Sequence, residues 1–133
     1  KIVNERFNQA KKELKLSRQA LKRWFTEKYL ENNPDTYEKI SSILSGNNMD
    51  NFLKVYELFV KHKNDEDFEK INTKTLIMTG EHDNGSTIEM SKQLNNVIKD
   101  SKLKIIKGGK HLCGIECADE VNLTIKNFVE KND

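Results

Sequence analysis

The chain has 133 residues, which suffices for one ordinary domain with a single core. Its formal net charge is +2, and its 23 basic and 21 acidic residues are mixed along the sequence, which excludes a basic nucleic-acid arm or an acidic tail. No apolar run approaches the ~18 residues of a membrane span, and residues 1–5 lack the hydrophobic core of a signal peptide. We therefore expect a folded cytoplasmic protein that binds neither membranes nor nucleic acid.

The first seventy residues carry helical patterns and no strand pattern. Apolar residues between 3 and 14 recur at spacings of four, three and four, which predicts an amphipathic helix. A second helix is expected to begin near Ser17, a good N-cap. Residues 33–35, Asn-Pro-Asp, place proline at the first position of a third helix, and a fourth is expected over about residues 50–61. This part of the chain, residues 1–70, is predicted to form a helical cap.

From Ile71 onward the periodicity changes to strand, helix and strand. The apolar run over residues 76–78 is followed closely by Gly80, as expected for a strand that is buried in a parallel sheet and ends in a turn. Residues 103–107 repeat the pattern before Gly108. Ser86 and Glu89 fit a capping box that opens the helix between the strands. A last helix is expected over about residues 119–130. The sequence therefore predicts an α/β fold in which residues 71–133 form a βαβα unit with parallel strands.

The two helices of this unit should each bury one apolar face against the sheet. The helix between the strands is expected to bury Met90, Leu94 and either Val97 or Ile98, and the last helix Val121, Ile125, Phe128 and Val129.

Two ionisable residues follow the predicted strands. Asp83 comes after the first strand and His111 after the second, each two residues from a glycine. The carboxyl ends of parallel strands meet at one edge of a sheet, where open α/β sheets place their active sites. A carboxylate and an imidazole at that edge can act as the orienting acid and the general base of a nucleophilic triad. Spacing alone favours the alternative that these are ordinary loop or surface residues, since one Asp and one His do not make a complete site.

Metal binding is not predicted. The cysteines, Cys113 and Cys117, lie four residues apart and can face one side of a helix. Two ligands do not complete a structural zinc site, and no further Cys or His pair stands at a suitable spacing.

At these residues the sequence resembles the α/β-hydrolase superfamily. Residues 80–83, Gly-Glu-His-Asp, and residues 108–111, Gly-Gly-Lys-His, are similar to the turns after the last two core strands of that fold, which carry the triad acid and histidine in this order. Residues 21–26, Leu-Lys-Arg-Trp-Phe-Thr, followed by Asn33-Pro34, resemble the lid helices of 3-oxoadipate enol-lactonase-like members. The fold class expected from the resemblance is a partial α/β-hydrolase fold.

The resemblance assigns a role to each matching residue. Asp83 is implied to be the triad acid and His111 the general base, while Arg23 and Trp24 are implied to face the substrate from the lid. It also implies a small-molecule ester or lactone as substrate and no metal or other cofactor. Residues 1–70 become the lid segment and residues 71–133 the carboxyl-terminal part of the hydrolase core.

The sequence departs from the family in what it lacks. None of its seven serines lies in a Gly-x-Ser-x-Gly motif, and neither the early strands nor the oxyanion-hole loop of the family is present. Ser86 lacks the second glycine and follows the acid's strand, so it is rejected as nucleophile. The chain also begins without Met, in a helical pattern. We therefore expect the carboxyl-terminal half of a hydrolase, inactive alone, whose nucleophile can be Ser, Cys or Asp.

Two partners remain open for such a half. Two strands leave sheet edges and apolar faces uncovered, which predicts pairing with the missing amino-terminal half or self-association. The alternative to an enzyme fragment is a non-catalytic, self-associating interaction module derived from a hydrolase half.

Overall fold

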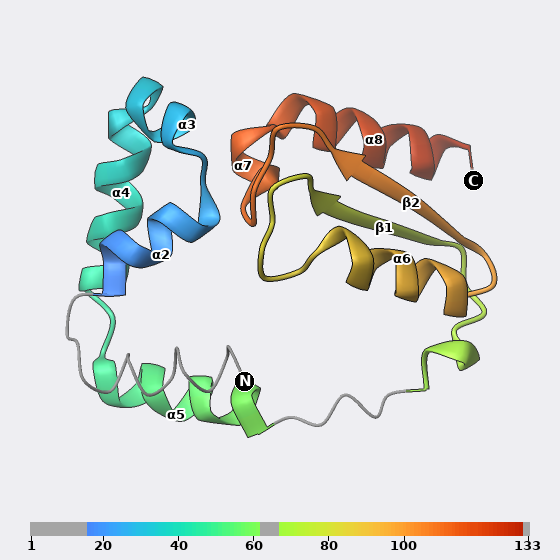
Figure 1. Ribbon diagram of the computed structural model, residues 1–133, viewed down its shortest axis with the longest axis horizontal. Helices are drawn as coiled ribbons and strands as arrows, with labels where there is room; N and C mark the ends of the chain where they lie inside the picture. Colours follow the sequence, from blue (N-terminus) through green and yellow to red (C-terminus); the bar gives the residue numbers. More distant parts are fainter. Residues whose placement is uncertain (1–15, 62–66, 132–133) are drawn as a thin grey trace. The chain divides into compact units, whose positions relative to one another are not determined.

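The computed structural model describes residues 16–61 and 67–131 (Figure 1). The apolar stripe over residues 3–14 therefore lies outside the described residues. In chain order the elements are α2 (Leu16–Trp24), α3 (Glu27–Asn32), α4 (Pro34–Ser45), α5 (Met49–Lys61), the 3-10 turn η1 (Phe68–Lys70), β1 (Thr75–Gly80), α6 (Ile88–Val97), β2 (Ser101–Ile106), α7 (Cys113–Glu116) and α8 (Ala118–Glu130).

The described residues fall into two compact units. One unit contains residues 16–21 and 33–61, and so includes α4 and α5. The other contains residues 22–32 and 67–131, and so combines α3 with both strands and the helices that follow them. The segment 22–32 thus belongs to the unit that carries the sheet. The functional division into a lid before residue 70 and a core after it stays a prediction.

The two strands form a parallel sheet, which confirms the predicted α/β class. The register runs from Thr75 opposite Ser101 to Gly80 opposite Ile106. Helix α6 connects the strands, and Figure 1 shows α6 and α8 on opposite sides of the strand pair. The side chain of Ile106 is fully buried and Ile77 is nearly so. The chain from Thr75 to Ile106 is therefore one βαβ unit.

The start of α6 differs from the predicted capping box by one residue. Thr87, not Ser86, is the N-cap, and its hydroxyl accepts a hydrogen bond from the backbone N–H of Met90 at 3.3 Å. The backbone N–H of Ser86 instead donates to the carboxylate of Asp83 at 3.0 Å. The capping prediction was therefore wrong by one residue, because the hydroxyl of Thr87, an equally suitable N-cap residue, lies at the helix start.

The predicted buried faces of the helices are only partly correct. In α6 the side chain of Ser91 is buried, as is that of Ile98 at its C-cap, whereas Met90 is 48% exposed. In α8 Val121 is buried, but Val129 is 48% exposed. Two strands about 5 Å apart are no wider than one helix, so the sheet covers only part of each helix. The further exposed apolar residues of these two helices are Val97, Leu123 and Ile125.

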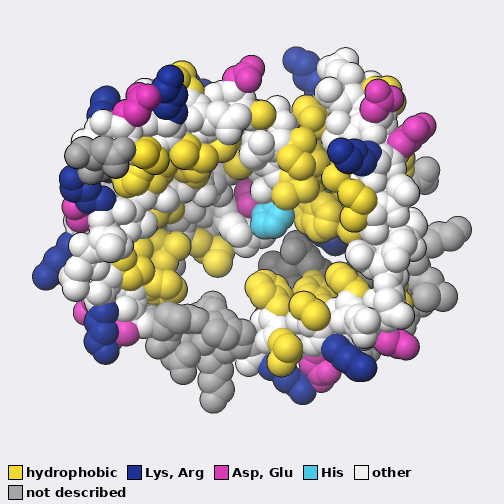
Figure 2. Space-filling model, turned by 180° about the vertical axis from the view of Figure 1, so that it is seen from behind, with side chains coloured by type: hydrophobic (Ala, Val, Ile, Leu, Met, Phe, Trp, Pro, Cys, Tyr) yellow, Lys and Arg dark blue, Asp and Glu magenta, His cyan; other side chains and the backbone are white. Residues whose placement is uncertain are grey.

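Hydrophobic side chains also reach the surface elsewhere (Figure 2). In α5 the side chains of Val55, Leu58 and Phe59 are more than 60% exposed. Single exposed apolar residues are ordinary, but several neighbouring ones indicate a surface that another element or chain covers. Within the described residues, no helix is both long and apolar enough to cross a membrane. The cytoplasmic location stays a prediction.

Candidate active site

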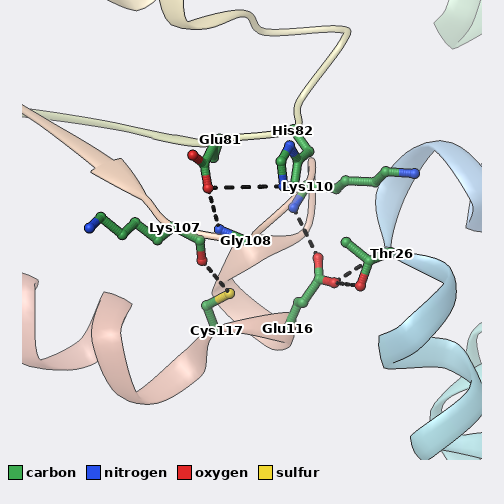
Figure 3. A network of polar contacts seen from close by, with 8 residues as sticks. All are labelled: Thr26, Glu81, His82, Lys107, Gly108, Lys110, Glu116 and Cys117. Carbon is green, nitrogen blue, oxygen red and sulfur yellow. Dashed lines mark hydrogen bonds and ion pairs between the residues drawn. The ribbon is translucent and has the colours of Figure 1, made fainter.

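The turns that follow β1 and β2 are joined by hydrogen bonds. The backbone N–H of Glu81 donates to the carbonyl oxygen of Ile106, and that of His82 donates to Gly109, both at 2.9 Å. The carboxylate of Glu81 accepts a hydrogen bond from the backbone N–H of Gly108 at 2.8 Å (Figure 3). These contacts bring the residues after the two strands to one edge of the sheet, as parallel strands require.

Glycines make this close approach of the two turns possible. A Cβ atom on Gly80 would lie 2.3 Å from the carbonyl oxygen of Lys110, and one on Gly109 would lie 2.7 Å from the Cβ of Cys113. Gly108 has a φ of 68°, in the left-handed region that other residues rarely adopt. The backbone geometry at this edge therefore requires glycine at positions 80, 108 and 109.

Asp83 and His111 meet where these turns come together. The Oδ2 atom of Asp83 lies 2.8 Å from Nδ1 of His111, and its Oδ1 atom accepts from the backbone N–H groups of Gly85 and Ser86 at 2.7 and 3.0 Å. The side chain of Asp83 is 6% exposed and that of His111 is 43% exposed. An ionised carboxylate can only accept hydrogen bonds. Nδ1 of His111 therefore carries the proton, and Nε2 is the ring atom left to exchange protons with another molecule.

The carboxyl of Asp83 is held in its ionised form. Burial by itself raises its pKa, but the hydrogen bonds from His111, Gly85 and Ser86 outweigh burial and leave the pKa below its ordinary value of 3.8. The carboxylate thus stays charged while it is almost removed from water.

This lowered pKa predicts a loss of stability in acid. The unfolded chain binds a proton at Asp83 more tightly than the folded chain, so the stabilisation is complete above about pH 3.8 and is lost as the pH falls through the lower folded pKa. The Asp83→Asn variant lacks this titration. We expect the difference in free energy of unfolding between the native chain and Asp83→Asn to shrink over that range, measured by urea unfolding. Asp119→Asn, at an exposed position, is the control, and an unchanged difference for Asp83→Asn would contradict the prediction.

Arg23 and Trp24 lie at the end of α2, and both are half-buried. The carbonyl oxygen of Trp24 accepts a hydrogen bond from the backbone N–H of Leu112 at 3.0 Å. The ammonium of Lys110 donates to the carbonyl oxygen of Lys22 at 2.9 Å. The end of α2 is therefore attached to the turn that carries His111, although the substrate roles of Arg23 and Trp24 stay predictions.

Sequence reasoning missed two residues of this region, Thr26 and Glu116. Glu116 ends α7 and accepts hydrogen bonds from Thr26 and from the backbone N–H of Lys110 (Figure 3). An acid five residues after His111 was visible in the sequence, but its partner lies 90 positions away. No local pattern links the two.

The cysteines are half-buried near this edge. Burial raises the pKa of both thiols, and for Cys113 the negative charge of Asp83 raises it further. Neutral thiols are poor nucleophiles and poor metal ligands. Across residues 16–61 and 67–131 no three His, Cys, Asp or Glu side chains gather as a group that could hold a metal ion.

The fold that positions these residues is part of the α/β-hydrolase fold, as comparison with solved structures shows. Models of protein families and curated protein sequences give no match to the chain. The sequence comparisons therefore assign no family, and the similarity rests on the structure comparison.

Two solved structures illustrate the match. The enol-lactonase from Burkholderia xenovorans LB400 has a TM-score of 0.86 and 23% sequence identity, over 95% of this chain and 49% of that chain. The bromoperoxidase from Bacillus anthracis has a TM-score of 0.66 and 28% identity, over 73% of this chain and 36% of that chain. The chain thus spans about half the length of the enol-lactonase. The two proteins are named for different reactions, so the fold alone does not determine the chemistry.

Proposed function

We propose that this chain is the portion of a serine-type α/β-hydrolase that supplies the acid and the histidine of its catalytic triad. The observation that carries the proposal is the hydrogen bond of 2.8 Å between Asp83 and His111 at the carboxyl ends of β1 and β2. A buried carboxylate that fixes the tautomer of an exposed imidazole is the arrangement that a general base needs. The nucleophile comes from outside this chain, because the sequence has no Gly-x-Ser-x-Gly motif.

Each residue then has a defined task. Asp83 accepts the Nδ1 proton of His111 in a hydrogen bond and stabilises the positive charge that forms on the ring. Nε2 of His111 takes the proton of the nucleophilic hydroxyl as its oxygen attacks the ester carbonyl, and then gives that proton to the leaving alcohol. Water then attacks the acyl-enzyme. Nε2 of His111 takes a proton from that water and returns it to the oxygen of the nucleophile as the carboxylic acid leaves. The chain also leaves open a Cys or an Asp as nucleophile. For either residue the first proton transfer would differ from the one described for a hydroxyl.

We propose a small ester or lactone as substrate. The likeness to a protein named an enol-lactonase supports this class, and so does the attachment of the α2 end to the His111 turn, since it keeps Arg23 and Trp24 close to the reacting groups. An Arg side chain suits a substrate carboxylate, and an indole ring suits an apolar substrate body.

The partner in this proposal is the amino-terminal half of the hydrolase. In the described residues β1 and β2 each have one neighbour, so each strand has a free edge, and α6 and α8 expose apolar residues beside them. Further strands would pair with these edges and cover the helices. They would also bring the nucleophile and the oxyanion hole.

The chain alone is therefore expected to be inactive. It should neither react with a serine-directed phosphonate nor hydrolyse a p-nitrophenyl ester, because it lacks the nucleophile. Addition or fusion of an amino-terminal hydrolase half should restore labelling by the phosphonate, detected by mass spectrometry. Labelling of the purified chain without that half would show that the nucleophile has been misjudged.

A non-catalytic, self-associating module is the second candidate. The exposed apolar side chains of α5, with Leu58 at 72% and Val55 at 67% exposure, favour it, since a dimer would cover them. The coding sequence upstream of Lys1 separates the two candidates. Strands followed by a nucleophile motif support the hydrolase, whereas a stop codon and an unrelated gene support the module.

A further inference from the structure

The carboxylate of Glu116 binds two parts of the unit that are distant in sequence. Its Oε1 atom accepts from the backbone N–H of Thr26 at 3.0 Å and from the Thr26 hydroxyl. Its Oε2 atom accepts from the backbone N–H of Lys110 at 2.9 Å. Figure 3 shows Glu116 reaching from α7 between these two residues. Both oxygens are thus used by donors, one on each side.

Further contacts run parallel to this bridge. The backbone N–H of Leu112 donates to Trp24 at 3.0 Å, and the ammonium of Lys110 donates to Lys22 at 2.9 Å. The residues immediately before and after His111 are therefore both attached to the segment 22–26. The Thr26 hydroxyl also accepts from the backbone N–H of Tyr29 at 3.2 Å, which fixes the start of α3.

We propose that Glu116 is a positioning residue that couples the segment 22–26 to the turn carrying His111. It touches neither Asp83 nor the imidazole, and it acts by fixing the backbone on which His111 is placed. The proposal rests on the proposed function, in which His111 is the base and the segment 22–26 faces the substrate. Through Glu116 the base and the residues facing the substrate move as one body.

The negative charge of Glu116 is essential to this role. Its three partners are all donors, and a carboxylate offers acceptors on both oxygens, whereas glutamine offers one oxygen and opposes an NH₂ group to the remaining donors. Hydrogen bonds to a charged acceptor are also stronger than neutral ones. Glu116→Gln keeps the size of the side chain and must leave Thr26 or Lys110 without an acceptor.

The test compares amide hydrogen exchange in the full chain and its variants by NMR. In Glu116→Gln, exchange at Thr26, Lys110 and Leu112 is expected to rise about tenfold or more, the factor for loss of a charge-assisted hydrogen bond. Exchange at Glu81, which reports the pairing of the two strand ends, should stay nearly unchanged. The Nδ1 proton signal of His111 should broaden, because its turn is no longer fixed.

Glu120→Gln is the matched control. Glu120 lies four residues further on and pairs with Lys104 at 2.6 Å, away from the segment 22–26, so its loss should leave Thr26, Lys110 and the His111 signal unaffected. Thr26→Ser, which keeps the hydroxyl, should behave like the native chain, whereas Thr26→Val should raise exchange at Lys110, and adding it to Glu116→Gln should add little.

Two results would overturn the proposal. One is a uniform rise of exchange that includes Glu81, which would make Glu116 an ordinary stabilising residue. The other is a Glu116→Gln chain whose Lys110 amide and His111 signal match those of Glu120→Gln. Neither readout needs catalysis. Failure of the coupling is therefore distinguishable from failure of the proposed function, which the activity of a His111→Ala enzyme tests.

Discussion

Under the proposed function, the His111→Ala variant of the hydrolase assembled with its amino-terminal half is expected to lose on the order of a thousandfold or more in kcat/KM. Alanine removes the proton acceptor for the nucleophile and the proton donor for the leaving group together. It also leaves the buried carboxylate of Asp83, which is 6% exposed, without its partner. The residual rate should come from substrate binding and from the oxyanion hole.

The measurement is the hydrolysis of a p-nitrophenyl ester by matched enzymes. His82→Ala is the control, because His82 lies in the turn of Asp83 but its imidazole is 55% exposed and lies 3.9 Å from the carboxylate of Glu81. We expect His82→Ala to retain nearly all activity. Comparable losses in the two variants would point to damage of the whole edge, and near-native activity of His111→Ala would refute the assignment of the base.

The parts of the fold that the sequence predicted are those that local chemistry determines. Short apolar runs that end at Gly80 and Gly108 predict strands and turns, since burial and glycine geometry act within a few residues. Parallel strands then require the two turns to share an edge. These two facts bring Asp83 and His111 to the same edge, while their direct contact, with Oδ2 of Asp83 at 2.8 Å from Nδ1 of His111, is seen only in the structure.

The parts that the sequence did not reveal depend on distant neighbours. The bond between Thr26 and Glu116 joins residues 90 positions apart, and neither residue lies in a pattern that names the other. Ser86 and Thr87 both have the residue type of an N-cap, and the sequence alone did not show that Thr87 caps α6. The exposure of Met90 depends on the width of the sheet, which the helix pattern does not contain.

Gly80 determines whether the two turns can meet at all, so Gly80→Ala is expected to be among the most damaging single changes in the chain. Its Cβ would lie 2.3 Å from the carbonyl oxygen of Lys110 and 2.5 Å from that of Gly109. Both are backbone atoms in the turn that carries His111 and cannot rotate away as a side chain can. We expect a loss of about 3 kcal/mol in the free energy of unfolding, the upper range for overpacking a well-packed site.

Gly114→Ala separates this steric effect from a general effect of alanine. A Cβ at Gly114, in α7, would have no atom within 4 Å, and alanine favours a helix over glycine by up to about 1 kcal/mol. Urea unfolding should therefore show Gly114→Ala equal to or slightly more stable than the native chain, and Gly80→Ala far less stable. Equal stability of the two variants would mean that the turn of His111 can move away from β1. In that case the hydrogen bond between Asp83 and His111 would not depend on the close approach at Gly80.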